Sequence, residues 1–306
     1  MKNEFAGILN GRHVALLMGG PGAEREVSLR SGAAVAEALR ACGARVSDLD
    51  VSGPGFTLPP ETDLVFNIIH GTFGEDGDLQ DLLDRTGIPY TGEGARGSRL
   101  AFDKIETKIL FDRCGVPTVA WETLLPGATP SLPFPMVVKA PRQGSSVGVH
   151  IVRTEADLAP AMEDCFQYGE RVLAEGFFSG RELTVGILGD EALPIVEIVP
   201  HEGFYDYEHK YTKGASEYHV PAMLPEEQTR AVQKAALDAH RALGLEVYSR
   251  VDVLLAPDGA MNVLEINTIP GMTATSLLPK AAGIAGFDFP ALCEVIAGLS
   301  FRKSRA

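Results

Sequence analysis

Apolar runs alternate with segments of helical spacing along the first third of the chain. Residues 13 to 20 (HVALLMGG) form an apolar run that ends in glycines, and residues 24 to 39 then place apolar side chains at helical spacing. A second apolar run, DLVFNIIHG at 63 to 71, precedes another helical segment that ends at Gly87. Continuous apolar runs are typical of buried strands, and strands that alternate with helices favour a parallel sheet. We therefore expect an α/β domain over residues 1 to 100, with functional loops at the carboxyl ends of its strands.

The middle of the chain mixes helices with shorter strands. Helical spacing at 102 to 114 and at 155 to 166 alternates with three short apolar runs, PMVVKA, VGVHIV and RVLAEGF. A Gly/Ser loop separates the first two of these runs. This pattern predicts a small α+β domain at 101 to 183.

The last part of the chain carries strands, a long helix and a hairpin. Apolar runs predict strands at 182 to 189 and 192 to 199, and helical spacing continues from 225 to 243 until Gly244 stops it. Together with the hairpin that follows, these elements predict a third domain at 184 to 306.

The hairpin, at 250 to 267, carries its polar residues on one face. Residues 257 to 260 (PDGA) are a turn signal between two apolar runs. With a loop of two or four residues, opposed residues have numbers that sum to 517, so that Asp252 faces Glu265. Arg250 then faces Asn267, and because side chains alternate in direction, all four lie on one face. The opposite, core face carries Val251, Val253, Leu264 and Ile266.

Two carboxylates opposed across a hairpin repel each other, so a positive charge should lie between them. The candidates are Arg250 and a divalent cation, and carboxylate oxygens with the amide carbonyl of Asn267 are hard ligands that suit Mg²⁺. A magnesium site and a solvated charged face with one Arg–Glu pair both fit the pattern. A three-residue loop would instead shift the register by one and place Asp252 and Glu265 on different faces.

Composition and charge narrow the class of protein. The 306 residues are enough for two or three domains, and 45% apolar with 22% charged residues is typical of a globular protein. The net charge of -14 argues against a nucleic-acid or anionic-membrane partner. Four scattered cysteines without a CxxC pair indicate a reducing compartment, with neither a disulfide framework nor a zinc site. The polar N-terminal segment and the lack of an apolar run of about 18 residues predict a cytoplasmic protein.

Two glycine-rich segments are candidates for phosphate binding. Residues 92 to 97 match GxGxxG, but Pro89 interrupts the preceding strand and Asp112 falls within a helix, which argues against a dinucleotide fold. The segment 137 to 149 (VVKAPRQGSSVGV) places Lys139 at the end of a buried strand, before a loop rich in amide and hydroxyl donors. Such a loop can wrap a polyphosphate, although an ordinary Gly/Ser hairpin with a solvated lysine fits the pattern as well.

Seven motifs in sequence order resemble the D-alanine:D-alanine ligase family of the ATP-grasp superfamily, over about residues 13 to 300. They are AEREVS (23 to 28), HGTFGEDG (70 to 77), FDKIETK (102 to 108), VVKAPRQGSSVGV (137 to 149), FYDYEHKY (204 to 211), RVDVLL (250 to 255) and LEINTIPGMTATSL (264 to 277). The first and fifth motifs are specific to the ligase branch. The resemblance implies a three-domain ATP-grasp fold of α/β and α+β parts. An N-terminal parallel-sheet (preATP-grasp) domain precedes a central and a C-terminal domain, which hold ATP between them.

The resemblance also implies nucleotide and metal ligands. Lys104 and Lys139 would contact the ATP phosphates, and Lys210 would meet the γ-phosphate. The remaining predicted ATP-binding residues are Ser146, Glu175, Phe177, Phe178 and Glu182. Residues 175 to 178 would line the adenine pocket, and Glu182 would contact the ribose. The predicted metal ligands are Asp252, Glu265 and Asn267. They would bind two Mg²⁺ ions, with Mn²⁺ as an alternative, which favours the metal interpretation of the hairpin.

The implied chemistry is carboxylate activation followed by amide formation. One D-alanine carboxylate attacks the γ-phosphate of ATP to give an acyl phosphate, and the amine of a second D-alanine displaces phosphate. Glu24 would hold the ammonium of the first substrate. Arg250, without an acidic partner, and the amide of Gly271 would stabilise the developing oxyanion. Ser276 and the main chain of Leu277 would hold the second carboxylate.

Two further implied roles concern a lid and a histidine. Glu24, Ser145 and Tyr211 match a hydrogen-bonded triad that orders a mobile loop over the site, and closure of this lid would protect the acyl phosphate from water. Aromatic packing in a strand is the alternative for Tyr211, because two other tyrosines lie beside it. His70 either lies near the first substrate or is a satisfied loop residue.

The expected partners are the small molecules D-alanine and ATP, with no nucleic acid and no membrane. Relatives in this family are commonly dimers, so a homodimer is expected. Ligases that join D-alanine to D-lactate or D-serine, and other ATP-grasp carboxylate–amine ligases, are alternatives. Depsipeptide-forming relatives usually carry phenylalanine in the lid motif, so Tyr211 favours an amino-acid acceptor. A nucleotide-binding protein without chemistry and a nicotinamide oxidoreductase are the rival classes.

Two features depart from the family pattern. Lys139 is followed by Ala140 and only then by Pro141, whereas the family usually has proline directly after this lysine, so the loop geometry is not predicted. The chain also begins about nine residues before the usual first strand, and this extension has no predicted function.

Overall fold

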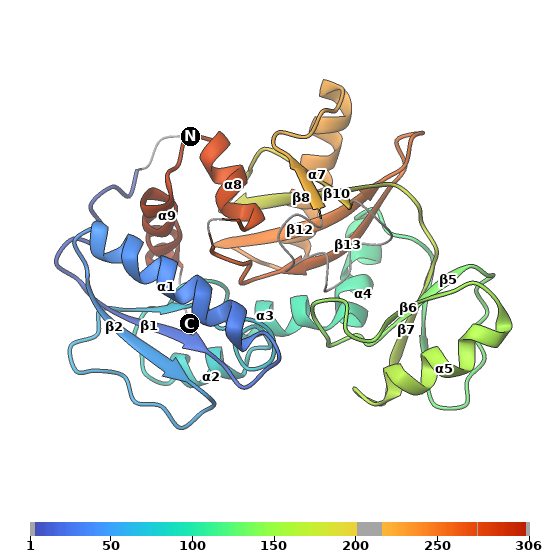
Figure 1. Cartoon of the computed structure of the whole chain (residues 1–306), viewed down its shortest axis with the longest axis horizontal. Helices are drawn as coiled ribbons and strands as arrows, with labels where there is room; N and C mark the ends of the chain where they lie inside the picture. The colour runs from blue at the N-terminus through green and yellow to red at the C-terminus, as the bar shows by residue number, and fades with distance from the viewer. Residues whose placement is uncertain (1–3, 201–215, 274, 304–306) are drawn as a thin grey trace.

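The computed structural model describes residues 4 to 200, 216 to 273 and 275 to 303. Three sheets organise these residues, and helices pack against each of them (Figure 1). One sheet is parallel and the other two are antiparallel. This mixture confirms the expected combination of α/β and α+β architecture.

The N-terminal sheet is parallel, as the alternation of apolar runs and helical spacing predicts. β1 (His13–Gly19) lies between β2 (Arg45–Val51) and β3 (Leu64–Asn67). α1 (Arg25–Ala41) follows β1 and packs against it. β3 is shorter than its apolar run, because the Asn67 side chain accepts a hydrogen bond from the amide of Ile69 and turns the chain out of the sheet.

The second sheet is antiparallel and small. Its strands run in the order β4-β7-β5-β6. They are β4 (Trp121–Leu124), β5 (Met136–Lys139), β6 (Val149–Val152) and β7 (Val172–Gly176). α5 (Glu155–Phe166) packs on this sheet and spans the residues that its periodicity predicts, because Thr154 and Asp157 form a capping box at its start.

The third and largest sheet holds the hairpin. Its strands run in the order β11-β10-β8-β12-β13, and β9 pairs with β8. They are β8 (Arg181–Leu188), β9 (Glu191–Ala192), β10 (Val196–Pro200), β11 (Ser216–His219), β12 (Tyr248–Leu255) and β13 (Met261–Asn267). The strand expected at 192 to 199 therefore divides into β9 and β10. β8 begins at Arg181 and so crosses the predicted domain boundary at residue 183. The division of the chain into domains at residues 100 and 183 stays a prediction.

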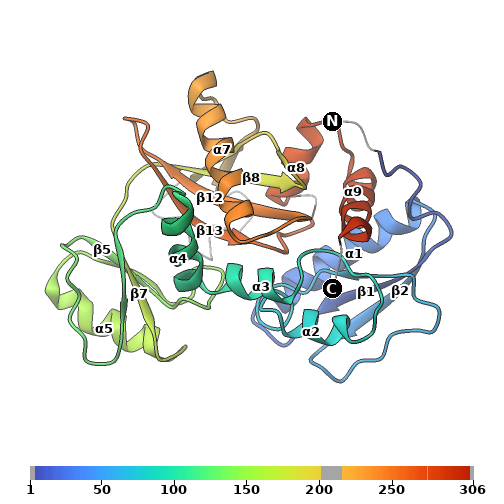
Figure 2. The same cartoon turned by 180° about the vertical axis from the view of Figure 1, so that it is seen from behind.

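Helices cover both faces of the third sheet. α7 (Glu226–Ala242) packs on β8, β12 and β13, and Figure 2 shows it in front of these strands. Gly244 follows α7 in the left-handed conformation, at φ 68°, which favours glycine and ends the helix. α8 (Leu277–Ile284) packs on the other face, where a side chain at Gly186 of β8 would collide with Leu278.

Three shorter helices connect the sheets. α2 (Asp78–Asp84) follows β3, and α3 (Ala95–Phe102) leads into α4 (Lys104–Cys114). The helix predicted from 102 starts at Lys104 instead, because Asp103 interrupts it and caps the first turn of α4 with its side chain.

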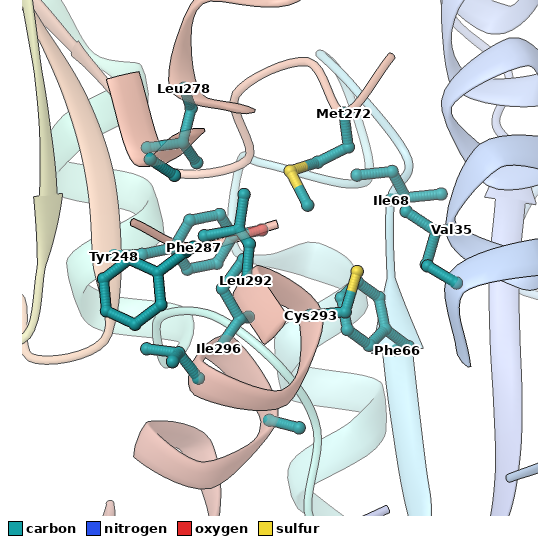
Figure 3. Packing of buried hydrophobic residues seen from close by; sticks show 14 of the residues in the cluster. Val35, Phe66, Ile68, Tyr248, Met272, Leu278, Phe287, Leu292, Cys293 and Ile296 are labelled. Carbon is teal, nitrogen blue, oxygen red and sulfur yellow. The ribbon is translucent and has the colours of Figure 1, made fainter. Parts of the chain in front are cut away.

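The largest hydrophobic core joins the N-terminal sheet to the third sheet. Leu292 and Ile296 of α9 (Phe289–Arg302) lie between Tyr248 of β12 and Phe66 of β3 (Figure 3). All four side chains are buried. Within the described ranges no single helix is long and apolar enough to cross a membrane, and α8 and α9 reach that length only as a pair bent by 100°.

The hairpin differs from its prediction at the turn. The strands next to the turn pair in the register of a three-residue loop, 257 to 259, which alone would place Asp252 and Glu265 on different faces. A β-bulge follows, in which Leu264 has no partner on β12, and beyond it Asp252 again faces Glu265. Leu264 is half-buried and not in the core as predicted, and Val263 takes that place with 0% exposure.

Candidate active site

Ten of the predicted site residues line one cavity of about 450 Å³. Glu24 lies just before α1, His70 follows β3, and Ser145 lies in the Gly/Ser loop after β5. The others lie on β12 and β13 and in the segment that follows them: Arg250, Asp252, Glu265, Asn267, Gly271, Ser276 and Leu277. Segments from distant parts of the chain therefore meet at this cavity. Lys210 and Tyr211 lie outside the described residues.

The two opposed carboxylates of the hairpin are each held by a different cation. Arg250 donates to both oxygens of Asp252, at 3.0 Å from Nε to Oδ1 and 2.8 Å from Nη2 to Oδ2. Lys104 Nζ lies 3.1 Å from Oε2 of Glu265. Arg250 does pair with an acid, contrary to our expectation, because the two-residue spacing on β12 places it on the same face as Asp252.

Thr184 of β8 supports the same carboxylate from the other side. Its Oγ1 donates to Oδ1 of Asp252 at 2.6 Å, and both side chains are buried. Nδ2 of Asn267 also donates to Oδ2 of Asp252, at 3.3 Å. The sequence did not identify Thr184, because its place opposite Asp252 depends on the pairing of β8 with β12, which no local pattern indicates.

The hairpin residues fit a magnesium site in their chemistry. Asp252, Glu265 and Asn267 lie on one face of the hairpin and line the cavity. Two carboxylates and an amide are hard ligands, and Mg²⁺ usually keeps its other positions for water and phosphate. Among the described residues, no group of three or more His, Cys, Asp or Glu side chains could hold a metal. The metal assignment stays a prediction.

Two members of the predicted triad are in contact. Ser145 Oγ donates to Oε1 of Glu24 at 2.6 Å. Ser145 and Ser146 both adopt left-handed backbone conformations, at φ 52° and 61°. Such conformations strain residues other than glycine and are common in functional loops.

His70 is both a cavity residue and a satisfied loop residue. Its ring is 5% exposed, Nδ1 lies 2.8 Å from the carbonyl oxygen of Ile269, and Nε2 lies 3.2 Å from Oγ of Ser31. A carbonyl only accepts, so Nδ1 carries the proton, and in the neutral ring Nε2 accepts from Ser31. Ser31 Oγ in turn accepts from the amide of Met272 at 3.3 Å. His70 and Ser31 therefore fix the loop that carries Gly271.

Gly271 approaches Ser276 closely. A Cβ atom at Gly271 would lie 2.9 Å from Oγ of Ser276. That hydroxyl accepts a hydrogen bond from the amide of Thr273 at 3.0 Å. Ser276 is the N-cap of α8, so the positive end of the helix dipole and the amide of Leu277 face this part of the cavity.

None of the predicted nucleotide residues that the structure describes lines this cavity, and Lys104 lies next to it. Lys104 Nζ donates to the carbonyl oxygen of Gln143 at 2.8 Å, and so connects the Gly/Ser loop to Glu265. Lys104 also lines a smaller adjoining cavity of about 20 Å³ with Glu265 and Asn267. Phe177 and Phe178 follow the end of β7, Glu182 lies on β8, and the roles of these residues stay predictions.

Glu175 of β7 is buried between two lysines. The carboxylate contacts Nζ of Lys139, at the end of β5, and lies 2.6 Å from Nζ of Lys108 on α4. Burial raises the pKa of Glu175, but the two ammonium groups outweigh it and lower that pKa to about 2. Glu175 is therefore ionised at neutral pH.

The GxGxxG segment, residues 92 to 97, has a structural role. Oε1 of Glu93, within it, accepts a hydrogen bond from the amide of Val247 at 2.7 Å, and Oε2 accepts one from Nζ of Lys303 at 2.7 Å. A larger cavity of about 970 Å³ lies beside this segment and includes none of the predicted site residues.

Comparisons with known proteins agree with this arrangement. A profile of the family "D-ala D-ala ligase C-terminus" matches residues 110–297, and one of "D-ala D-ala ligase N-terminus" matches residues 51–93. A D-alanine–D-alanine ligase of Methylacidiphilum infernorum is 51% identical over 96% of this chain and 97% of the relative. The chain belongs to the D-alanine–D-alanine ligase family.

Other members of the D-alanine–D-alanine ligase family are similar over nearly the whole chain. A ligase of this name from Syntrophotalea carbinolica is 44% identical over 96% of this chain and 98% of its own. The crystal structure of D-alanine–D-alanine ligase from Bacillus anthracis has a TM-score of 0.85 at 32% identity, over 95% of this chain and 98% of the other. The D-Ala:D-Ser ligase VanG of Enterococcus faecalis has a TM-score of 0.83 at 26% identity, over 95% and 100%. The resemblance seen in the motifs and the expected ATP-grasp fold are thereby confirmed.

Lys108 and Glu75 are two further residues near the site that the sequence did not identify. Lys108 lies four residues after Lys104 on α4, a spacing that places both on one face and could have indicated a joint role. Glu75 lies in the HGTFGEDG motif and lines the cavity near His70. Burial raises the pKa of the Glu75 carboxyl, and the nearby His70 ring, with Nδ1 at 3.8 Å from Oε1, opposes that shift.

Proposed function

We propose that this protein joins two D-alanine molecules to D-alanyl-D-alanine, converting ATP to ADP and phosphate, for the synthesis of peptidoglycan precursors. The observation that carries the proposal is the single cavity that ten predicted residues line. Identity of 51% to a curated D-alanine–D-alanine ligase supports the same reaction.

The reaction has two steps. A carboxylate oxygen of the first D-alanine attacks the γ-phosphorus, the bond to ADP breaks, and an acyl phosphate forms. The amine nitrogen of the second D-alanine then attacks the acyl carbon, phosphate leaves, and the nitrogen loses a proton to give the amide. Both steps move negative charge, which Arg250 and the amide of Gly271 stabilise at the cavity wall.

The substrates bind at opposite parts of the cavity. Glu24 holds the ammonium of the first D-alanine, and its contact with Ser145 orients the carboxylate. Ser276 and the amide of Leu277 hold the carboxylate of the second D-alanine, since the N-terminus of α8 attracts an anion. His70 places the loop that joins the two subsites.

ATP binds between the second and third sheets. Lys104 and Lys139 contact its phosphates, together with the loop that contains Ser146, and Lys210 meets the γ-phosphate. Asp252, Glu265 and Asn267 hold two Mg²⁺ ions, or Mn²⁺ ions. Bound Mg²⁺ supplies positive charge to the phosphate oxygens. The 3.1 Å contact of Lys104 with Glu265 supports adjacent phosphate and metal sites.

Three further proposals rest on the family resemblance. Tyr211 closes a lid over the site by joining Glu24 and Ser145, which excludes water from the acyl phosphate. The enzyme acts in the cytoplasm. It is a homodimer, which sedimentation equilibrium tests by a mass about twice the 32.7 kDa of one chain.

The decisive assay measures phosphate release from ATP and Mg²⁺, with D-alanine, D-serine or D-lactate as the second substrate. We expect release that depends on D-alanine, with D-alanyl-D-alanine as the product. A preference for D-lactate at neutral pH would contradict the choice of acceptor. D-serine is the second candidate, because a D-Ala:D-Ser ligase matches the fold at 26% identity. ATP binding without D-alanine-dependent release would favour a nucleotide-binding protein without chemistry.

A further inference from the structure

Lys108 is a lysine that no predicted role explains. It lies on α4 with a side chain that is 0% exposed. Its Nζ atom lies 2.6 Å from Oε1 of Glu175, 2.5 Å from Oγ1 of Thr118 and 3.2 Å from the carbonyl oxygen of Val263. Two hydrogen bonds and one ion pair surround the ammonium, and the side chain is fully buried, so Lys108 is not accessible to a ligand.

Lys108 connects two sheets through these contacts. Glu175 belongs to β7 of the second sheet, and Val263 belongs to β13 of the third sheet, two residues before Glu265. Burial lowers the pKa of Lys108, and Glu175 opposes that effect by raising it. A buried ammonium persists only with such a partner.

Lys139 stands at the other end of the same ionic chain. Its side chain is 8% exposed, compared with 3% for Glu175 and 0% for Lys108, so Lys139 is the most exposed of the three charged groups. Two ammonium groups share one carboxylate, which leaves one net positive charge in a largely buried place. A net buried charge is costly, and an anionic ligand at the exposed end would offset that cost.

We propose that Lys108 is a positioning residue of the nucleotide site. It holds and neutralises Glu175, so that Lys139 keeps a net positive charge for the phosphates of ATP. Lys108 itself does not touch the nucleotide. The inference rests on the proposed function and deepens it, because it says why the phosphate lysine can share a buried carboxylate and still attract an anion.

The test compares Lys108→Met, Lys108→Arg and the exposed-lysine control Lys234→Met with the wild type. Binding of Mg²⁺ with a non-hydrolysable ATP analogue is measured by calorimetry, KM for D-alanine by phosphate release, and folding by circular dichroism. In Lys108→Met the pair of Glu175 and Lys139 is neutral. We expect roughly tenfold weaker nucleotide binding, the effect of one unit charge over roughly 10 Å at an effective dielectric constant of about 20. KM for D-alanine and the control should match the wild type.

The arginine variant separates charge from packing. It keeps one positive charge beside Glu175 but not the contacts of the Lys108 ammonium, so nucleotide binding should stay within about threefold of the wild type. Equal weakening in Lys108→Met and Lys108→Arg would overturn the inference, as would unchanged binding in a folded Lys108→Met. If Lys108→Met does not fold, Lys108→Gln replaces it under the same thresholds. A wild type that binds no nucleotide would overturn the proposed function as well.

Discussion

Asp252 and Glu265 would repel each other if nothing lay between them, and the structure compensates each one separately. Arg250 and Thr184 bind Asp252, whereas Lys104 reaches Glu265 from a different helix. The two acids can therefore face each other in a folded protein before any metal binds. The same cations lie where the phosphates of the proposed nucleotide would bring their negative charge.

Gly271 gives a prediction at the scale of one side chain. In Gly271→Ala the new methyl group would lie 2.9 Å from Oγ of Ser276 and displace that hydroxyl. We expect KM for the second D-alanine to rise about tenfold, as for the loss of one hydrogen bond to a charged group. KM for ATP should stay near the wild-type value, which steady-state kinetics with each substrate varied in turn would show.

The matched control is Gly283→Ala on α8, where a Cβ atom meets nothing within 4 Å. It should leave both KM values unchanged. An equal rise in both KM values for Gly271→Ala would show a general loss of structure, and would contradict a specific role at the second carboxylate.

At the scale of elements, local sequence patterns predicted which helices and strands form better than they predicted how the strands pair. α5 spans the predicted residues because its capping box and periodicity are local signals. β2 was not predicted, because its sequence RVSDLDV mixes charged and apolar residues and its strand is stabilised by pairing with β1. The β-bulge at Leu264 could not be predicted either, since the loop alone would have separated the two acids and only the pairing around β12 restores them.

α7 and β12 provide a prediction about pH. His240 of α7 is 1% exposed, and its Nδ1 lies 2.8 Å from Oγ of Ser249 on β12. Burial lowers the pKa of His240 to about 4, from 6.5 when exposed. As the pH falls, the unfolded chain binds a proton at His240 before the folded chain does. The contribution of the neutral, buried His240 to the unfolding free energy is therefore fully present above pH 6.5 and is lost as the pH falls toward 4. We expect His240 to remove about 2 kcal/mol of unfolding free energy between pH 7 and pH 5.

Urea unfolding at the two pH values measures this loss. His240→Gln should lose about 2 kcal/mol less than the wild type between pH 7 and pH 5. Ser249→Ala keeps the buried imidazole and should keep the pH dependence, with lower stability at both values. If His240→Gln and the wild type showed the same pH dependence, His240 would not be the cause of the loss of stability between pH 7 and pH 5.

At the scale of the whole molecule, the cavity depends on how the two ends of the chain meet. Glu24 and His70 lie in loops that follow strands of the N-terminal sheet, whereas the hairpin belongs to the third sheet and α8 packs on that sheet. α9 lies between the two sheets in one hydrophobic core. The motifs could predict that these segments share a function, but not that α9 joins them, because helical periodicity does not say which surface a helix covers.

The N-terminal extension has a structural explanation at this scale. Phe5 is 7% exposed and packs against Gly298 of α9, where any Cβ atom would collide with its ring. Arg302 lies over the same ring at 4.3 Å. The amide of Gly7 also donates to Oε1 of Glu294 at 2.6 Å. The described part of the extension, residues 4 to 12, therefore fixes α9 and includes none of the residues that line the cavity.

Phe5→Ala should lower the unfolding free energy by about 3 kcal/mol, because it leaves a cavity in the core. KM for D-alanine and for ATP should change little. Phe134→Ala, at a side chain that is 40% exposed, is the matched control and should cost much less. Denaturant unfolding with parallel kinetics measures both; a large rise in KM with little loss of stability would place Phe5 near the site instead.

The most direct test of the central claim is the Mg²⁺ dependence of D-alanine-driven phosphate release, for the wild type, Glu265→Gln and the exposed control Glu227→Gln. If the opposed acids hold the metal, Glu265→Gln should need at least about tenfold more Mg²⁺ for half-maximal rate and should turn over far more slowly. The control should follow the wild type. Near-wild-type turnover and Mg²⁺ dependence in Glu265→Gln would contradict a metal site on this hairpin.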